Sequence, residues 1–167
     1  MIMTKIKENI TTGGIWKLME EIYDPEIPVL SIIDLGIIRD IQINNNDIEV
    51  FITPTYSGCP AMDIISMNIR IALMQDGFKN IKITQQLSPA WTTDWMTQHG
   101  KEKLKAYGIA PPLRKRFDQK YLEELKVECP LCHSQNTKLI SQFASTACKA
   151  LYQCNDCLEP FDYFKCH

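Results

Sequence analysis

Four cysteines occur in two pairs whose spacing is typical of metal binding. Cys129 and Cys132 form one Cys-x-x-Cys pair, and Cys154 and Cys157 form a second pair 21 residues further on. Each pair can fold as a tight turn that points two sulfurs at one ion, and two pairs complete a tetrahedron. The residues between the pairs are too few to bury a core unaided, so the metal must supply folding free energy, typically about 10 kcal/mol or more for structural zinc. The pattern predicts a closed structural zinc site in a ribbon.

Other donors near these four leave alternatives open. Four thiolates also suit an iron–sulfur cluster, which is the main competitor to zinc. Cys148 could replace a ligand, but a free thiol that packs as a small apolar residue is the favoured interpretation. The remaining spare donors are His133, Cys166 and His167, the last two at a terminus that can fray.

Cys59 is the only cysteine in the first 128 residues, in a segment that joins a strand end to a helix start. Pro60 at the first helical position would place Cys59 at the N-cap, where free backbone N–H groups and the helix dipole favour an anion. We therefore expect a lowered thiol pKa and competence as a soft-metal ligand or nucleophile. A buried structural cysteine is an equal alternative, and His99 is a remote candidate for a Cys/His pair.

Two further sets of side chains could bind a ligand. Asp24-Pro25-Glu26 places two carboxylates in a rigid loop, as an acid/base pair or as metal ligands, although capping and solvation are the commoner uses. Trp91 and Trp95 follow Ser88-Pro89 one helical turn apart, and core packing is favoured over a stacking platform.

The charge pattern argues against nucleic acid as the partner. The formal net charge is −2, and the three lysines from residue 129 onward are matched by three acids, so little counterion release would drive binding. Protein docking is the better hypothesis for the ribbon. Phe161, Tyr163 and Phe164 either pack on the ribbon or form a partner-facing anchor. Seven basic residues between Lys101 and Lys120 indicate a solvated helix end and linker.

Hydrophobic periodicity predicts a small α+β domain before the ribbon: a three-stranded sheet with flanking helices, in the order helix-strand-strand-helix-strand-helix. In the second helix, Ile64, Met67, Ile71 and Met74 form the predicted apolar stripe, widened by Ile65 and Ile69. The expected elements are helices at 15–22, 60–76 and 89–107, a hairpin of strands 37–43 and 48–53, and a strand at 80–87. We predict an α+β domain at 1–108, a basic linker at 109–127 and the zinc ribbon at 128–167.

No apolar run approaches the roughly 20 residues that span a bilayer, and no secretory signal is present. We therefore expect a cytoplasmic protein with no membrane partner. The chain also lacks a diiron Glu-x-x-His arrangement on long helices, a Rossmann fingerprint and a P-loop. It is not expected to activate oxygen, bind NADPH or hydrolyse ATP by itself.

Several long motifs resemble known families. Asp24-Pro25-Glu26-Ile27-Pro28, Asp34-Leu35-Gly36, residues 53–60 and Ser88-Pro89-Ala90-Trp91 resemble the SufT-like iron–sulfur-assembly domain family. With residues 145–152 and 159–164, the chain from 16 to 167 is similar to the PaaD family, also called PaaJ, of bacterial phenylacetate degradation. Cys166 departs from the proline expected there, so a family-wide metal role for Cys166 is in doubt.

The resemblance implies an accessory component of the multicomponent phenylacetyl-CoA epoxidase, in which the oxygenase and reductase are separate chains. It associates Cys59 with the handling of iron or iron–sulfur centres. Because one thiolate cannot hold a cluster, the hypothesis favours exchange between two subunits and therefore a homodimer. The alternatives are a stoichiometric structural subunit of the epoxidase, a nucleic-acid-binding ribbon and a thiol oxidoreductase.

Overall fold

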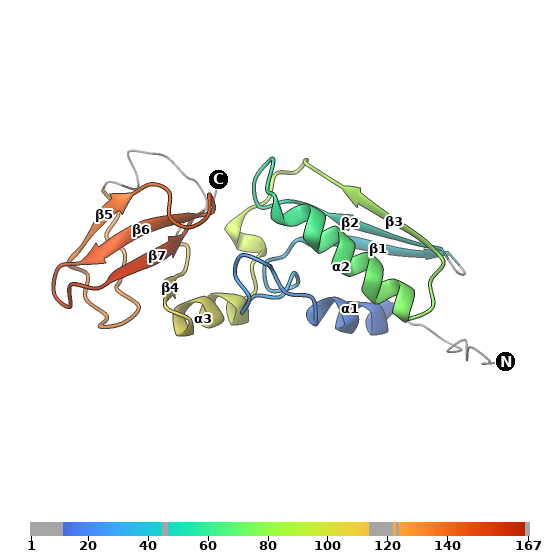
Figure 1. The fold of residues 1–167 in the computed structure, drawn as a ribbon, viewed down its shortest axis with the longest axis horizontal. Helices are drawn as coiled ribbons and strands as arrows, with labels where there is room; N and C mark the ends of the chain where they lie inside the picture. The colour runs from blue at the N-terminus through green and yellow to red at the C-terminus, as the bar shows by residue number, and fades with distance from the viewer. Residues whose placement is uncertain (1–11, 45–46, 114–121, 123, 166–167) are drawn as a thin grey trace.

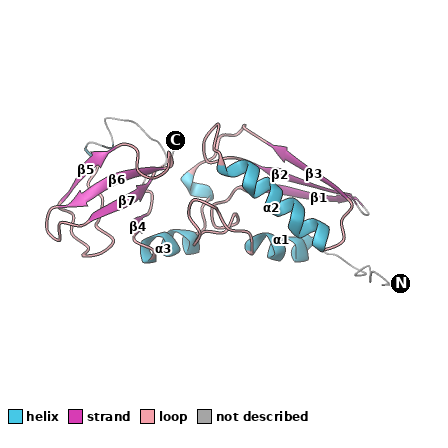
Figure 2. Cartoon of the chain, viewed as in Figure 1, coloured by secondary structure: helices cyan, strands magenta, loops and turns pink. Residues whose placement is uncertain are grey.

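The computed structural model describes residues 12–44, 47–113, 122 and 124–165 (Figure 1). It has two units, a helix-and-sheet domain that we call the assembly domain and a ribbon that follows it. Figure 2 shows the sheet of the ribbon as strands joined by loops, whereas helices cover the first sheet. Among the described residues, no helix is long and apolar enough to cross a membrane. The predicted α+β class is confirmed.

The sheet of the assembly domain has the strand order β1-β2-β3. The strands β1 (Ile38–Asn44) and β2 (Asp47–Ile52) form the predicted antiparallel hairpin, and β3 (Asn80–Gln85) lies parallel to β2. Helix α2 (Ala61–Gln75) makes the crossover between β2 and β3, and α1 (Thr12–Glu20) precedes the hairpin. The loop that carries Cys59 is therefore at the end of a central strand, directly before α2.

The buried face of α2 differs from the predicted one. Ile65, Ile69 and Leu73 are fully buried against the sheet, with Ala61 and Met62. The residues predicted as the core stripe are instead 45–60% exposed: Ile64, Met67, Ile71 and Met74. The helix is apolar on two faces, so periodicity alone could not select the one that meets the sheet.

The predicted helix at 89–107 is also shorter than expected. A 3₁₀ turn, η1 (Thr93–Trp95), comes first, and α3 (Gln98–Ala106) begins only after Thr97, whose hydroxyl accepts the Gly100 N–H at 2.9 Å. Thr97 is thus the N-cap, rather than Ser88. Trp91 lies in the preceding loop, where its indole N–H donates to the Leu35 carbonyl at 2.8 Å.

Trp91 and Trp95 consequently do not share a helical face. Trp91 is 3% exposed and belongs to the core, while the Arg39 guanidinium lies 3.5 Å from the centroid of the Trp95 ring. The packing interpretation therefore holds for Trp91. Gly36 has φ +67°, and a β-carbon there would collide with the backbone carbonyl of Trp95. This contact explains the glycine.

The ribbon is a four-stranded sheet with the order β4-β7-β6-β5. Strands β5 (Thr137–Ser141) and β6 (Lys149–Cys154) match the expected β-type segments. Strand β7 (Pro160–Phe164) contains the aromatic segment, and β4 (Ile109–Ala110), at the start of the expected linker, pairs with β7 in parallel. The basic residues at 114–120 lie outside the described part of the chain.

The aromatic residues of β7 pack inward. Tyr152 stacks on Phe161 with ring centroids 6.0 Å apart and meets Tyr163 edge-on at 5.7 Å. Phe164 is 1% exposed and contacts Trp91 of the assembly domain, edge to face at 6.2 Å. Phe164 is therefore part of the core of the assembly domain, and the ribbon is attached to that domain through a buried aromatic contact.

Candidate functional site

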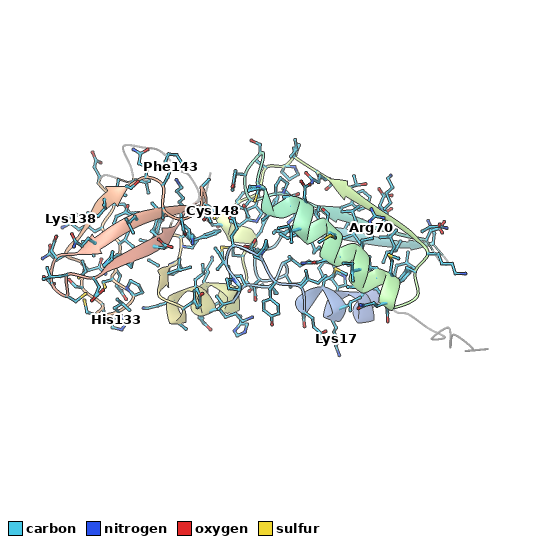
Figure 3. The ribbon with its side chains drawn as sticks, viewed as in Figure 1. Lys17, Arg70, His133, Lys138, Phe143 and Cys148 are labelled. Atoms are coloured by element: carbon cyan, nitrogen blue, oxygen red, sulfur yellow. The ribbon has the colours of Figure 1, made fainter. Side chains whose placement is uncertain are left out.

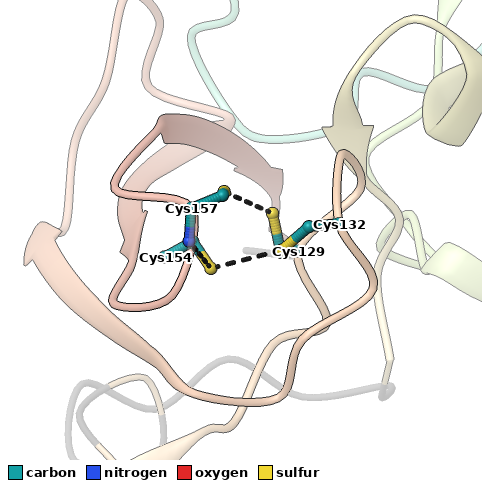
Figure 4. Close-up of side chains that lie close together, drawn as sticks. All are labelled: Cys129, Cys132, Cys154 and Cys157. Atoms are coloured by element: carbon teal, nitrogen blue, oxygen red, sulfur yellow. Dashed lines mark hydrogen bonds between the residues drawn. The ribbon is translucent and has the colours of Figure 1, made fainter.

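The four paired cysteines converge on one point, as their spacing predicts (Figure 4). Their sulfurs all lie within 4.8 Å of one another, with 3.8 Å between Cys129 and Cys157 and 3.5 Å between Cys132 and Cys154. Tetrahedral zinc with Zn–S bonds of about 2.3 Å places its sulfurs about 3.8 Å apart. The donor set and its dimensions therefore fit a closed four-thiolate zinc site.

The two cysteine turns have the same backbone geometry. The residue after each pair, His133 or Leu158, has a positive φ of 63° or 65°. The first cysteine of each pair donates its N–H to the residue five positions later: Cys129 to the Ser134 carbonyl at 2.9 Å and Cys154 to the Glu159 carbonyl at 3.0 Å. The repetition indicates two equivalent knuckles around one ion.

Backbone N–H groups already point at the sulfurs. The N–H of Cys157, followed by that of Asp156, lowers the pKa of the Cys154 thiol to about 7. The Ser134 N–H acts the same way on Cys132, but the adjacent Cys154 thiol and burial outweigh it and raise that pKa to about 12. Bound zinc would deprotonate all four thiols and replace their mutual repulsion by attraction to one dication.

The spare donors do not join this group in the described structure. His133 instead contacts the Glu128 carboxylate, with 3.0 Å between Nδ1 and Oε1. Cys148 lies at the end of the ribbon that faces the assembly domain, away from His133 (Figure 3). Cys166 and His167 lie outside the described residues.

Cys59 is placed one residue earlier than predicted. Helix α2 begins at Ala61 with Pro60 as its N-cap, so Cys59 precedes the cap. The Ala61 N–H still reaches the thiol and lowers its pKa, but desolvation by burial is larger, and the net shift is upward. The expectation of a lowered pKa is therefore wrong at this site, because sequence shows the helix end but not the burial around it.

Tyr56 is the functional neighbour that sequence reasoning did not single out. Its hydroxyl hydrogen-bonds with the Cys59 thiol, and burial, followed by the charge of Cys59, raises the pKa of Tyr56. The phenol therefore stays protonated and donates to the sulfur, whereas His99, the candidate partner in the sequence, is exposed on α3. The position of Tyr56 three residues before Cys59 is the signal that could have found it.

A cleft of about 370 Å³ opens beside this loop. Its walls come from the Cys59 loop and from the segment around Trp91, and the lining residues are Thr53, Pro54, Thr55, Tyr56, Ser57, Leu87, Ala90 and Trp91. Cys59 itself is half-buried. The thiol is thus sheltered by the protein and has a cavity next to its hydrogen-bonding partner.

The two carboxylates of the Asp-Pro-Glu loop have different surroundings. Asp24 Oδ1 accepts the N–H groups of Glu26 and Ile27, both at 2.8 Å, so Asp24 caps its own loop. Glu26 Oε2 instead lies 3.7 Å from the sulfur of Cys148 in the ribbon. The structure therefore brings Glu26 together with a cysteine for which the sequence favours a packing role.

Comparison with known proteins agrees with both units. Residues 14–77 match the family model described as "Iron-sulfur cluster assembly protein", and residues 115–165 match the "PaaD zinc beta ribbon domain". An Escherichia coli protein, named as one of the subunits of a "Putative 1,2-phenylacetyl-CoA epoxidase", is 51% identical over 152 residues, which cover 91% of each chain. A "Fe-S protein maturation auxiliary factor" of Porphyromonas gingivalis is 33% identical over 53% of this chain and 85% of its own.

Solved structures resemble the assembly domain. A domain of unknown function from Bacillus anthracis covers 55% of this chain and 89% of its own with a TM-score of 0.52 and 24% identity. A conserved hypothetical protein from Thermotoga maritima covers 61% and 98% with a TM-score of 0.50 and 26% identity. With the relative that matches 91% of the chain, these findings establish that the protein belongs to the PaaD family of phenylacetyl-CoA epoxidase subunits, built from an iron–sulfur-assembly domain and a zinc ribbon.

Proposed function

We propose that this protein is a non-catalytic maturation component of a multicomponent phenylacetyl-CoA epoxidase and assists assembly of an iron or iron–sulfur centre through Cys59. The observation that carries the proposal is the setting of that thiol. Cys59 is half-buried, and both the Tyr56 hydroxyl and the Ala61 N–H stabilise its thiolate form. Burial nevertheless keeps it protonated at rest, so a metal must displace the proton to bind.

This balance suits transient binding. A thiol with a raised pKa binds metal with an affinity that depends on pH and on release of a proton, whereas the hydrogen bonds prepare the site for the charged sulfur. Iron that arrives at Cys59 can therefore leave again when a client with more thiolates or carboxylates competes for it. The family relationship to iron–sulfur-assembly proteins supports the same direction.

The ribbon serves as a rigid docking module in this proposal. Its zinc site has four protein ligands and no open position, so it contributes structure rather than chemistry. The balanced charge of the ribbon favours a protein partner over nucleic acid. We infer that the partner is the oxygenase or the reductase of the epoxidase system, in the cytoplasm.

The proposal is tested by producing oxygenase and reductase together with the wild-type protein or with Cys59→Ser. The expected result is a several-fold loss of iron from a purified client with the variant, and a parallel loss of phenylacetyl-CoA epoxidation. Ser57→Ala, in the same loop, is the matched control and should behave as wild type. Full iron occupancy in both clients with Cys59→Ser would rule out handling of iron by this thiol.

A stoichiometric structural subunit is the second candidate. One observation favours it: four large apolar side chains on α2 are exposed, namely Ile64, Met67, Ile71 and Met74. Such a stripe on a protein surface suits a permanent interface. Under this alternative the protein copurifies with the oxygenase at fixed stoichiometry, and charge on the stripe, as in Met67→Glu, disrupts the complex without changing client iron.

A further inference from the structure

A second group of metal-ligand side chains lies at the junction of the two units. Cys148 is 5% exposed and precedes β6, yet it packs in the core of the assembly domain rather than in that of the ribbon. Its sulfur lies 3.1 Å from the Thr146 hydroxyl and 3.7 Å from Glu26 Oε2. The thiol thus points away from the closed zinc site and toward the assembly domain.

Cys59 belongs to the same neighbourhood. Tyr56, the hydrogen-bonding partner of Cys59, also experiences the charges of Glu26 and Cys148. Burial is the main cause that raises the pKa of both thiols, to about 11 for Cys148, and the carboxylates of Glu26 and Asp24 raise both further. One carboxylate cluster therefore acts on a thiol from each unit.

We propose that Cys59, Cys148 and Glu26 form a second metal site, which holds a divalent first-row transition metal, iron(II) in the cell, between the assembly domain and the ribbon. This inference rests on the proposed function for the identity of the metal but not for the existence of the site. Two sulfurs and one carboxylate oxygen form a mixed donor set suited to such ions. The second thiol comes from the same chain, so binding does not require a homodimer.

The geometry is close to what an ion requires. Sulfur and oxygen ligands of one tetrahedral ion, at about 2.3 and 2.1 Å from it, lie about 3.6 Å apart, and Cys148 Sγ and Glu26 Oε2 are separated by 3.7 Å. Asp24 fixes Glu26 by capping the loop with Oδ1. Among the described residues the three donors are not all within 4.8 Å, so the Cys59 side chain must rotate to complete the site.

Charge balance also favours a cation here. Two neutral thiols beside ionised Glu26 become two thiolates when the ion binds, and two protons leave to solvent. The loaded site then carries one net negative charge. The buried Lys165 ammonium, whose charge acts on Cys148, lies nearby, and Lys149 pairs with Asp162 at 3.1 Å while its charge also acts on Asp24. These two lysines offset the negative charge of the loaded site.

Three protein ligands give this site a property that the ribbon site lacks. A four-coordinate ion would keep one open position, as in catalytic rather than structural metal sites. A client thiolate could enter there and displace the protein ligands one at a time. The closed site therefore maintains the fold, whereas the junction site is built for exchange.

The test is an anaerobic titration of full-length, zinc-loaded protein with cobalt(II), which substitutes for iron(II) and gives a thiolate charge-transfer band. Wild type is expected to bind one further ion with this band. Cys59→Ser and Cys148→Ser should each lose about half of the band per bound ion and bind about tenfold more weakly or worse. Glu26→Gln should weaken binding while it keeps the band.

Matched controls are Cys166→Ser, at a cysteine outside both proposed sites, and Glu21→Gln, at an exposed carboxylate; both should behave as wild type. If Cys148→Ser does not fold, X-ray absorption of wild type loaded with iron(II) decides instead, with two sulfur ligands expected. A wild-type protein that takes up no ion beyond zinc overturns the inference. So does a band unchanged in Cys148→Ser, or oxidation of the thiol pair to a disulfide without metal uptake.

The outcome is distinguishable from that of the maturation proposal because purified protein is titrated without any client. A metal site at the junction with unchanged client iron would contradict the maturation role alone. Loss of client iron in Cys59→Ser without metal uptake by the wild-type protein would contradict the junction site alone.

Discussion

At the scale of single residues, Asp34 ties three segments of the assembly domain together. Its Oδ2 accepts from the Lys103 ammonium at 2.7 Å and Oδ1 from the Thr97 hydroxyl at 2.9 Å, and the Ser31 N–H donates at 3.2 Å. Burial opposes the charged form, but these donors outweigh it and lower the pKa of Asp34. The carboxylate therefore contributes to stability while it is ionised.

Asp34→Asn is expected to lower the free energy of unfolding at pH 7 by about 2 kcal/mol, because a charged acceptor with several donors is lost. The contribution is present above the unfolded-state pKa of about 3.8 and is lost as the pH falls through the lower folded-state pKa. Urea unfolding of both proteins at pH 7 and near pH 3 measures this. Glu21→Gln, at an exposed carboxylate, is the control, and a difference that stays constant with pH would contradict the prediction.

The zinc ligands and the thiol of Cys59 show which residue properties can be predicted from sequence. Cys129, Cys132, Cys154 and Cys157 could be assigned because each pair is local and the spacing itself fixes the knuckle. The pKa direction at Cys59 could not, because burial by distant segments outweighs the local N–H groups. The contact between Cys148 and Glu26 joins residues 122 positions apart, a separation that no local pattern reports.

At the scale of elements, α2 has two apolar faces with different energetic roles. Ile69→Ala is expected to cost about 2–5 kcal/mol, because the side chain is fully buried and leaves a cavity. Met67→Ala, on the exposed face, should change stability by no more than about 0.5 kcal/mol. Chemical denaturation of the two variants measures the difference. Equal losses would mean that the exposed face is also covered in the protein alone.

The assignment of helices and strands shows a similar limit. The hairpin and the first two helices follow from periodicity and turn residues, and the structure places them close to the predicted bounds. The predicted start of α3 is wrong because Ser88-Pro89 has the residue types of a helix start, while Thr97 makes the actual cap. The aromatic strand β7 could not be identified as a strand because its neighbours supply the pairing.

Removal of zinc should unfold the ribbon. A strong chelator is expected to abolish protection of the amides in β5, β6 and β7 against hydrogen exchange, because the metal supplies on the order of 10 kcal/mol to a unit with little core of its own. The sheet β1-β2-β3 should keep its protection. Restoration by added zinc is the control, and ribbon amides that stay protected in metal-free protein would contradict the structural role.

At the scale of the whole molecule, the two units are joined through a shared core. Phe164 and Cys148 of the ribbon belong to the core of the assembly domain, and Lys105 pairs with Glu128 across the connection at 2.8 Å. The junction therefore fixes the position of the ribbon relative to the loop of Cys59. A composite metal site at this junction requires that rigidity.

Phe164→Ala is expected to cost about 3–5 kcal/mol and to separate the unfolding of the two units, because the edge contact with Trp91 and a fully buried ring are lost. Calorimetry should then show two transitions in place of one. Tyr107→Ala, at a 54% exposed ring, is the control. A single unchanged transition in Phe164→Ala would contradict a cooperative junction.

The central claim is that the protein matures a client and is not needed for turnover. The most direct measurement is phenylacetyl-CoA epoxidation by oxygenase and reductase that were produced together with this protein and then freed of it. We predict full activity and full iron content after its removal. Activity that falls on removal and returns when metal-free protein is added back would contradict maturation and establish a structural subunit.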